Sequence, residues 1–213
     1  MVTALIREKI VAAVQGESKT QALSNRLLCQ LPQLRDKLTL PEDDPVAGLI
    51  AFIRDYVESV PDCILLVTAV SKHMGFYDYA QPFLDMAEDY FLHPPDGLST
   101  DGELAALMDE AFLAHRLLEE VNDHHIRHLQ RPLLPIDMTE ANVIVHHLLG
   151  DEVANRLDQK VSDTAETLLS REYVWAKVKS IPPNSAAATQ LFKYNKATWS
   201  TRRIRLRLAS EAS

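Results

Sequence analysis

Glycine is scarce in this chain, with only 6 glycines among 213 residues. Few glycines combined with long periodic apolar segments favour helices over an all-β fold, which needs many turns. The 11 prolines fall mostly between the apolar segments rather than inside them, and we expect Pro61 to end the helix that precedes it. We therefore predict an all-α protein, a compact bundle of about seven to nine helices.

Cysteine is also rare, because Cys29 and Cys63 are the only two and form no C-x-x-C motif. This excludes a disulfide-rich scaffold and a zinc site of the Cys/His type. We expect two reduced thiols, with one disulfide as the alternative. Charged residues from Arg7 onward do not fit a signal peptide, and the longest uncharged apolar run, residues 63–71, is too short to cross a bilayer. These absences predict a cytoplasmic protein without a membrane segment.

Motifs of known chemistry are absent as well. The sequence contains no P-loop, no G-x-G-x-x-G and no G-x-S-x-G. No reaction is therefore indicated, and the sequence leaves open whether the protein is an enzyme.

The net charge of -8 is divided unevenly along the chain. Residues 171–213 contain nine Lys and Arg residues and two acidic residues, whereas residues 1–170 contain 13 and 28. We predict one helical domain, residues 1–181, followed by a basic C-terminal arm, residues 182–213. The arm could lie on its own acidic body, cross to a second copy and form a homo-oligomer, or bind a polyanion. Nucleic acid is the least favoured partner, because the acidic body would repel phosphates.

Within this arm, arginine alternates with aliphatic residues over positions 203–208. A period of two predicts an extended segment with one apolar side. A helical continuation is the alternative, since Arg and Leu are good helix formers.

Two adjacent amphipathic segments, residues 103–131 and 137–169, hold six of the chain's eight histidines. Their short proline-rich connection predicts a long antiparallel helical hairpin. On a helical wheel the apolar stripes of the two segments include or border six polar residues: His115, Glu119, Asn122, His125, His147 and Asp151. Pairing the helices around residues 133–135 places Glu119 level with Asp151 and Asn122 level with His147.

Imidazole and carboxylate groups on facing helices are the ligands with which helical bundles hold iron, manganese or zinc. The candidate metal ligands are Glu119, His147 and Asp151, with His115, Asn122 and His125 as further ligands or as supporting groups. A small polar ligand could occupy the same place. In the alternative interpretation these groups only hydrogen-bond one another, and the protein is a non-catalytic helical interaction or homodimerisation module.

Overall fold

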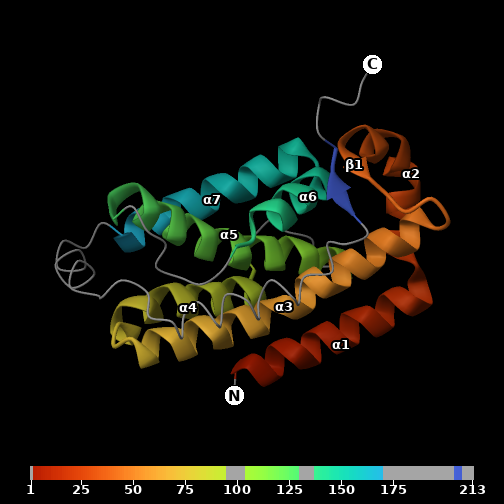
Figure 1. Ribbon diagram of the computed structural model, residues 1–213. Helices are drawn as coiled ribbons and strands as arrows, with labels where there is room; N and C mark the ends of the chain where they lie inside the picture. Colours follow the sequence, from red (N-terminus) through yellow and green to blue (C-terminus); the bar gives the residue numbers. More distant parts are fainter. Residues whose placement is uncertain (1, 95–103, 130–136, 170–203, 208–213) are drawn as a thin grey trace.

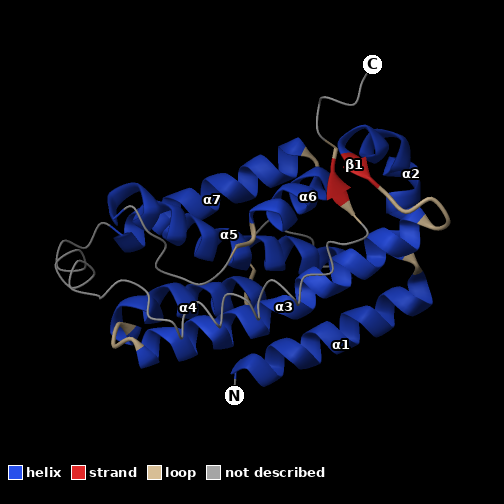
Figure 2. Ribbon diagram, viewed as in Figure 1, coloured by secondary structure: helices blue, strands red, loops and turns tan. Residues whose placement is uncertain are grey.

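The computed structural model of the protein describes residues 2–94, 104–129, 137–169 and 204–207. Within these ranges the chain forms helices and one short two-stranded sheet (Figures 1 and 2). The helices are α1 (Val2–Thr20), α2 (Ala22–Lys37), α3 (Pro45–His73), α4 (Tyr77–Leu92), α5 (Leu104–Leu129), α6 (Thr139–Leu149) and α7 (Asp151–Leu169). The predicted all-α class is confirmed. Among the helices of the described ranges, none combines the length and the apolarity needed to cross a bilayer.

Helix α5 is the central element, because α1, α3, α4, α6 and α7 all pack against it. Its side chains are buried on nearly every side between Leu104 and Val121. Each fully buried Leu or Phe of such a helix contributes about 1.5–3 kcal/mol to folding. Polar side chains on α5 therefore lie inside the protein, where they need partners.

Helix α3 is longer than the sequence suggested. It begins at a proper cap, where Asp44 Oδ1 accepts a hydrogen bond from the Ala47 backbone N–H at 2.9 Å and Pro45 occupies the first turn. The prediction that Pro61 would end this helix is wrong, because the helix continues to His73. A proline inside a helix removes one backbone hydrogen bond, and the extensive burial of α3 on both sides of Pro61 outweighs that loss.

The second arm of the hairpin differs from the prediction of one continuous helix. The chain leaves the helical conformation at Gly150, which has φ 84° and ψ 151°, so that α6 and α7 are separate helices. Positive φ is strained for residues with a Cβ and is readily adopted by glycine. Helix α5 packs on both α6 and α7, so the hairpin is retained with its second arm in two parts.

The C-terminal arm contributes a strand to its own body. β2 (Arg205–Leu206) pairs antiparallel with β1 (Leu38–Thr39), and the Arg207 N–H donates to the Lys37 carbonyl at 2.8 Å. Ile204 is buried in the core, and β2 also contacts α6. The predicted extended conformation is confirmed for these residues, whereas the predicted boundary between residues 181 and 182 lies outside the described residues.

Candidate functional site

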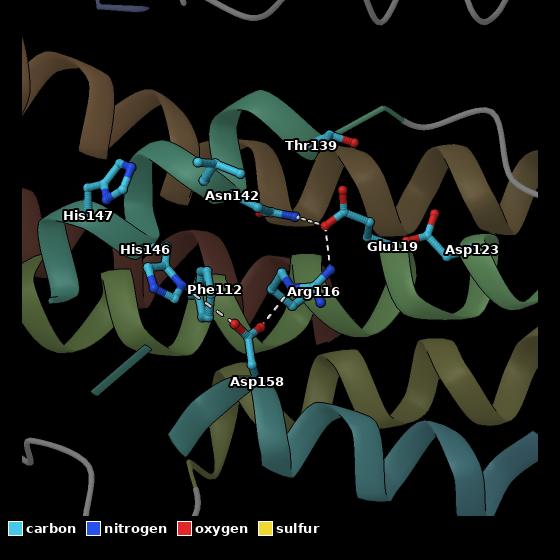
Figure 3. Close-up of a pocket in the computed structure, with 10 residues that line it drawn as sticks. Phe112, Arg116, Glu119, Asp123, Thr139, Asn142, His146, His147 and Asp158 are labelled. Carbon is cyan, nitrogen blue, oxygen red and sulfur yellow. Dashed lines mark hydrogen bonds and ion pairs between the residues drawn. The ribbon is translucent and has the colours of Figure 1, made fainter. Parts of the chain in front are cut away.

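A pocket of about 550 Å³ lies between α5, α6 and α7 (Figure 3). Helix α5 contributes Phe112, Arg116, Glu119 and Asp123, helix α6 contributes Thr139, Asn142, Val143, His146 and His147, and helix α7 contributes Asp158. The α5 residues recur at spacings of three and four, which place them on one face of the helix. The volume falls within the range of small-molecule sites.

Arg116 is the cation of this pocket and is held between two helices. Its Nε donates to Asp158 Oδ1 at 2.8 Å and its Nη1 donates to Glu119 Oε2. Burial opposes the charged form, but the hydrogen bonds and the charges of Asp158 and Glu119 outweigh burial and raise the pKa of Arg116. The guanidinium therefore stays charged, and carboxylates on two sides neutralise it.

Glu119 is oriented by groups from two further helices. Asn142 Nδ2 on α6 donates to Glu119 Oε2 at 2.7 Å, and Tyr56 on α3 donates its hydroxyl to Asn142 Oδ1 at 2.6 Å. Burial, followed by the charge of Glu119, raises the pKa of Tyr56, so the phenol stays a neutral donor. A line of hydrogen bonds thus runs from the core to the pocket and fixes the carboxylate.

His146 bridges α6 and α7 across the break at Gly150. Its Nδ1 lies 3.5 Å from Asp158 Oδ2, and its Nε2 lies 3.4 Å from Asp151 Oδ1. The neighbouring His147 is partly buried, and burial together with the charges of His146 and Lys37 lowers the pKa of His147. The imidazole of His147 is therefore neutral near pH 7.

Two of the candidate metal ligands, His115 and His125, are on α5, where both are fully buried and contact different helices. His125 Nδ1 lies 2.6 Å from the Val121 carbonyl, and its Nε2 lies 2.8 Å from the Tyr79 hydroxyl on α4. His115 Nε2 lies 3.0 Å from Ser59 Oγ on α3, and burial lowers the pKa of His115 to about 4. Both side chains belong to the buried interface of α5 with α3 and α4.

The structure therefore separates the six candidate metal ligands. Glu119 and His147 line the pocket, His115 and His125 face α3 and α4, Asn122 is buried, and the exposed Asp151 lies near His146. Among the described residues, no group of three or more His, Cys, Asp or Glu side chains is arranged to hold a metal ion. The expected level pairs do not form, since Glu119 meets Asn142 rather than Asp151.

Of the ten residues that line the pocket, only Glu119 and His147 were among the candidates predicted from the sequence, and the two most important omissions are Arg116 and Asn142. Arg116 carried a signal, because it precedes Glu119 and Glu120 by three and four residues and shares the helical face of Phe112 and Asp123. No sequence pattern identifies Asn142, because its contact with Glu119 depends on where α6 crosses α5. Comparisons of this chain with protein-family models, curated proteins and solved structures find no match, so its function must be inferred from the pocket.

Proposed function

We propose that the pocket between α5, α6 and α7 binds a small polar ligand and that the protein works as a ligand-binding helical domain. The observation that carries this proposal is a preformed pocket whose charged groups are fixed by hydrogen bonds from surrounding helices. Small-molecule sites combine apolar walls with a few oriented polar groups. Phe112 and Val143 supply the walls, and Glu119, Asp158 and the two histidines supply the polar groups.

The orientation of Glu119 supports binding over a purely structural role for this face. Tyr56 and Asn142 hold the carboxylate from the core side, while Asp123 and Thr139 at the pocket are exposed. Side chains held by such supporting contacts keep the geometry that a ligand requires.

A matched pair of substitutions tests the proposal. Val143 lines the pocket and is 38% exposed, so Val143→Trp should fill the pocket without disturbing the core. Val11→Trp is the control, because Val11 lies on α1 and is 55% exposed. Polar small molecules that raise the melting temperature of the unsubstituted protein should also stabilise Val11→Trp but not Val143→Trp. Equal stabilisation of both variants would contradict the proposal.

The narrower hypothesis is that the ligand is iron, manganese or zinc. Elemental analysis of protein purified without chelator or affinity metal tests it directly. Stoichiometric metal that is lost in His147→Ala, with the helical circular-dichroism signal retained, would support this form of the proposal.

A second candidate function is a non-catalytic helical interaction or homodimerisation module. The favouring observation is that polar groups buried on α5 are engaged with protein groups, as His125 is with Tyr79 and Glu119 with Asn142. The mass in solution should be measured for the full chain and for a chain lacking residues 199–213. Conversion of a dimer to a monomer by this deletion, with the melting temperature unchanged, would favour the module, because it would separate loss of an interface from loss of the contacts that β2 makes with its own protomer.

A further inference from the structure

We propose that the pocket between α5, α6 and α7 selects a small organic cation, an aliphatic amine or guanidine, as its ligand. This inference rests on the proposed function and narrows the ligand to one chemical class.

The charges of the lining favour a cation over an anion. Three carboxylates, Glu119, Asp123 and Asp158, share the pocket with a single guanidinium. Arg116 already donates to two of them and lies 3.7 Å from Glu120 as well. An anion would therefore meet a neutralised arginine and carboxylate repulsion, whereas a cation would meet an excess of negative charge.

One end of the pocket presents carboxylate acceptors. The hydrogen bonds from Arg116 and Asn142 both end on Oε2 of Glu119. In Figure 3 the second oxygen of this carboxylate points away from Arg116, and Asp123 lies at the same end of the pocket. Burial, followed by the charges of Glu119 and Glu120, raises the pKa of Asp123 against the opposing charges of Arg116 and Arg127. An ammonium or guanidinium group placed here would donate to Glu119 and Asp123.

The remaining lining suits an uncharged aliphatic stem and a second polar group. Phe112 and Val143 offer apolar surface, and His146 and His147 lie at the end of the pocket away from Asp123 (Figure 3). Burial, followed by the charges of His146 and Lys37, lowers the pKa of His147, so at mildly alkaline pH this imidazole adds no positive charge. The acidic body of the chain would also raise the local concentration of cations.

Three four-carbon probes of matched size test the class of ligand: 1,4-diaminobutane, 1,4-butanediol and succinate. Calorimetric titration at low ionic strength and about pH 8 should show saturable 1:1 binding of the diamine alone. Val143→Trp should abolish this binding, and Val11→Trp should retain it.

A single-charge pair of variants separates the pocket from the acidic surface in general. Asp123→Asn should weaken diamine binding about two- to five-fold, the effect of one exposed ion pair. Asp43→Asn removes the same charge from an exposed position that does not line the pocket and should leave the affinity unchanged.

The outcomes distinguish this inference from the proposed function. Binding of succinate or butanediol that Val143→Trp abolishes would overturn the cation class and leave the ligand site standing. Diamine binding that is insensitive to Val143→Trp and weakened equally by Asp123→Asn and Asp43→Asn would overturn the inference, since the acidic surface would explain it. If none of the probes binds at up to about 10 mM, the cation inference fails, and the melting-temperature comparison of Val143→Trp with Val11→Trp decides the proposed function separately.

Discussion

Two faces of α5 carry polar side chains at similar helical spacing, yet they meet different environments. On the face toward α3 and α4, His115 and His125 are at most 1% exposed and contact neutral hydroxyl and carbonyl groups. On the face toward α6 and α7, Arg116 and Glu119 are charged and border a pocket of about 550 Å³. A polar residue in an apolar stripe thus marks a site only where the facing helices leave space.

The packing partners explain the difference. The ring centroids of Tyr56 and His115 lie 4.7 Å apart, and those of Tyr79 and His125 lie 5.4 Å apart, so aromatic rings fill this interface. On the other face, α6 ends at Leu149 and the chain turns at Gly150 before α7 begins. Two separate helices therefore cover α5 where one long helix was expected, and the pocket lies between them and α5.

The largest effect that we expect is on the charged face. Arg116→Ala should lower the free energy of unfolding by about 3–5 kcal/mol, because it leaves Glu119 and Asp158 without their cation. Urea denaturation measures this loss. Arg54→Ala is the control, since Arg54 is half exposed and lies 3.8 Å from Asp55, and it should change stability by less than about 1 kcal/mol. Similar losses in both variants would show that water screens the pocket charges as it screens surface charges.

The pH dependence of stability tests the face of α5 toward α3 and α4. Burial lowers the pKa of His115 to about 4, below its ordinary value of about 6.5. Between these values the unfolded chain binds a proton that the folded protein does not, so stability falls as the pH decreases from 6.5 to 4. The expected loss from this residue is up to about 3 kcal/mol.

Asp109 acts in the opposite direction over the same range. Burial raises the pKa of its carboxyl to about 6, so protonation stabilises the folded state as the pH falls below 6. The contribution of His115 is therefore obtained by comparison with His115→Gln at each pH. The stability advantage of the unsubstituted protein over this variant should shrink between pH 6.5 and 4. A pH-independent difference would mean that the His115 environment is wetter than the structure indicates.

A third experiment asks whether the two faces are independent. His125→Ala should cost about 2–3 kcal/mol, because it opens a cavity and removes the partner of the Tyr79 hydroxyl. It should leave diamine affinity unchanged, since His125 does not line the pocket. The control His93→Ala, at a side chain that is 76% exposed, should affect neither quantity. Loss of ligand affinity in His125→Ala would show that the two faces of α5 are energetically coupled.

Sequence periodicity was sufficient for the helices but not for their ends. The apolar stripes predicted helical structure across α3 and α4. Pro61 lies inside a helix that was expected to end there, whereas Gly150 ends a helix that was expected to continue. Whether either residue breaks a helix depends on tertiary packing, which local pattern does not contain.

The candidate site was predictable as a region and not as a set of residues. The helical wheel placed Glu119 and His147 within or at the edge of the inward stripes, and both line the pocket. The prediction of which residues lie opposite one another in the hairpin assumed two straight helices. The turn at Gly150 changes which residues of the second arm face α5. Asn142 therefore takes the place opposite Glu119 that was expected for Asp151.

The smallest expected effect concerns Asp123, where stability and binding should change in opposite directions. Burial and the charges of Glu119 and Glu120 raise the pKa of Asp123, so its ionised form is less favourable in the folded state than in the unfolded chain. Asp123→Asn should therefore raise the free energy of unfolding at pH 7, by less than about 0.5 kcal/mol, while it weakens diamine binding. Thermal unfolding of this variant and of Asp43→Asn, which should leave stability unchanged, measures whether the free energy of unfolding rises or falls. Charges that serve a binding site commonly lower stability, and this combination of changes is their signature. A loss of stability above about 1 kcal/mol would instead assign Asp123 a structural role like that of His125.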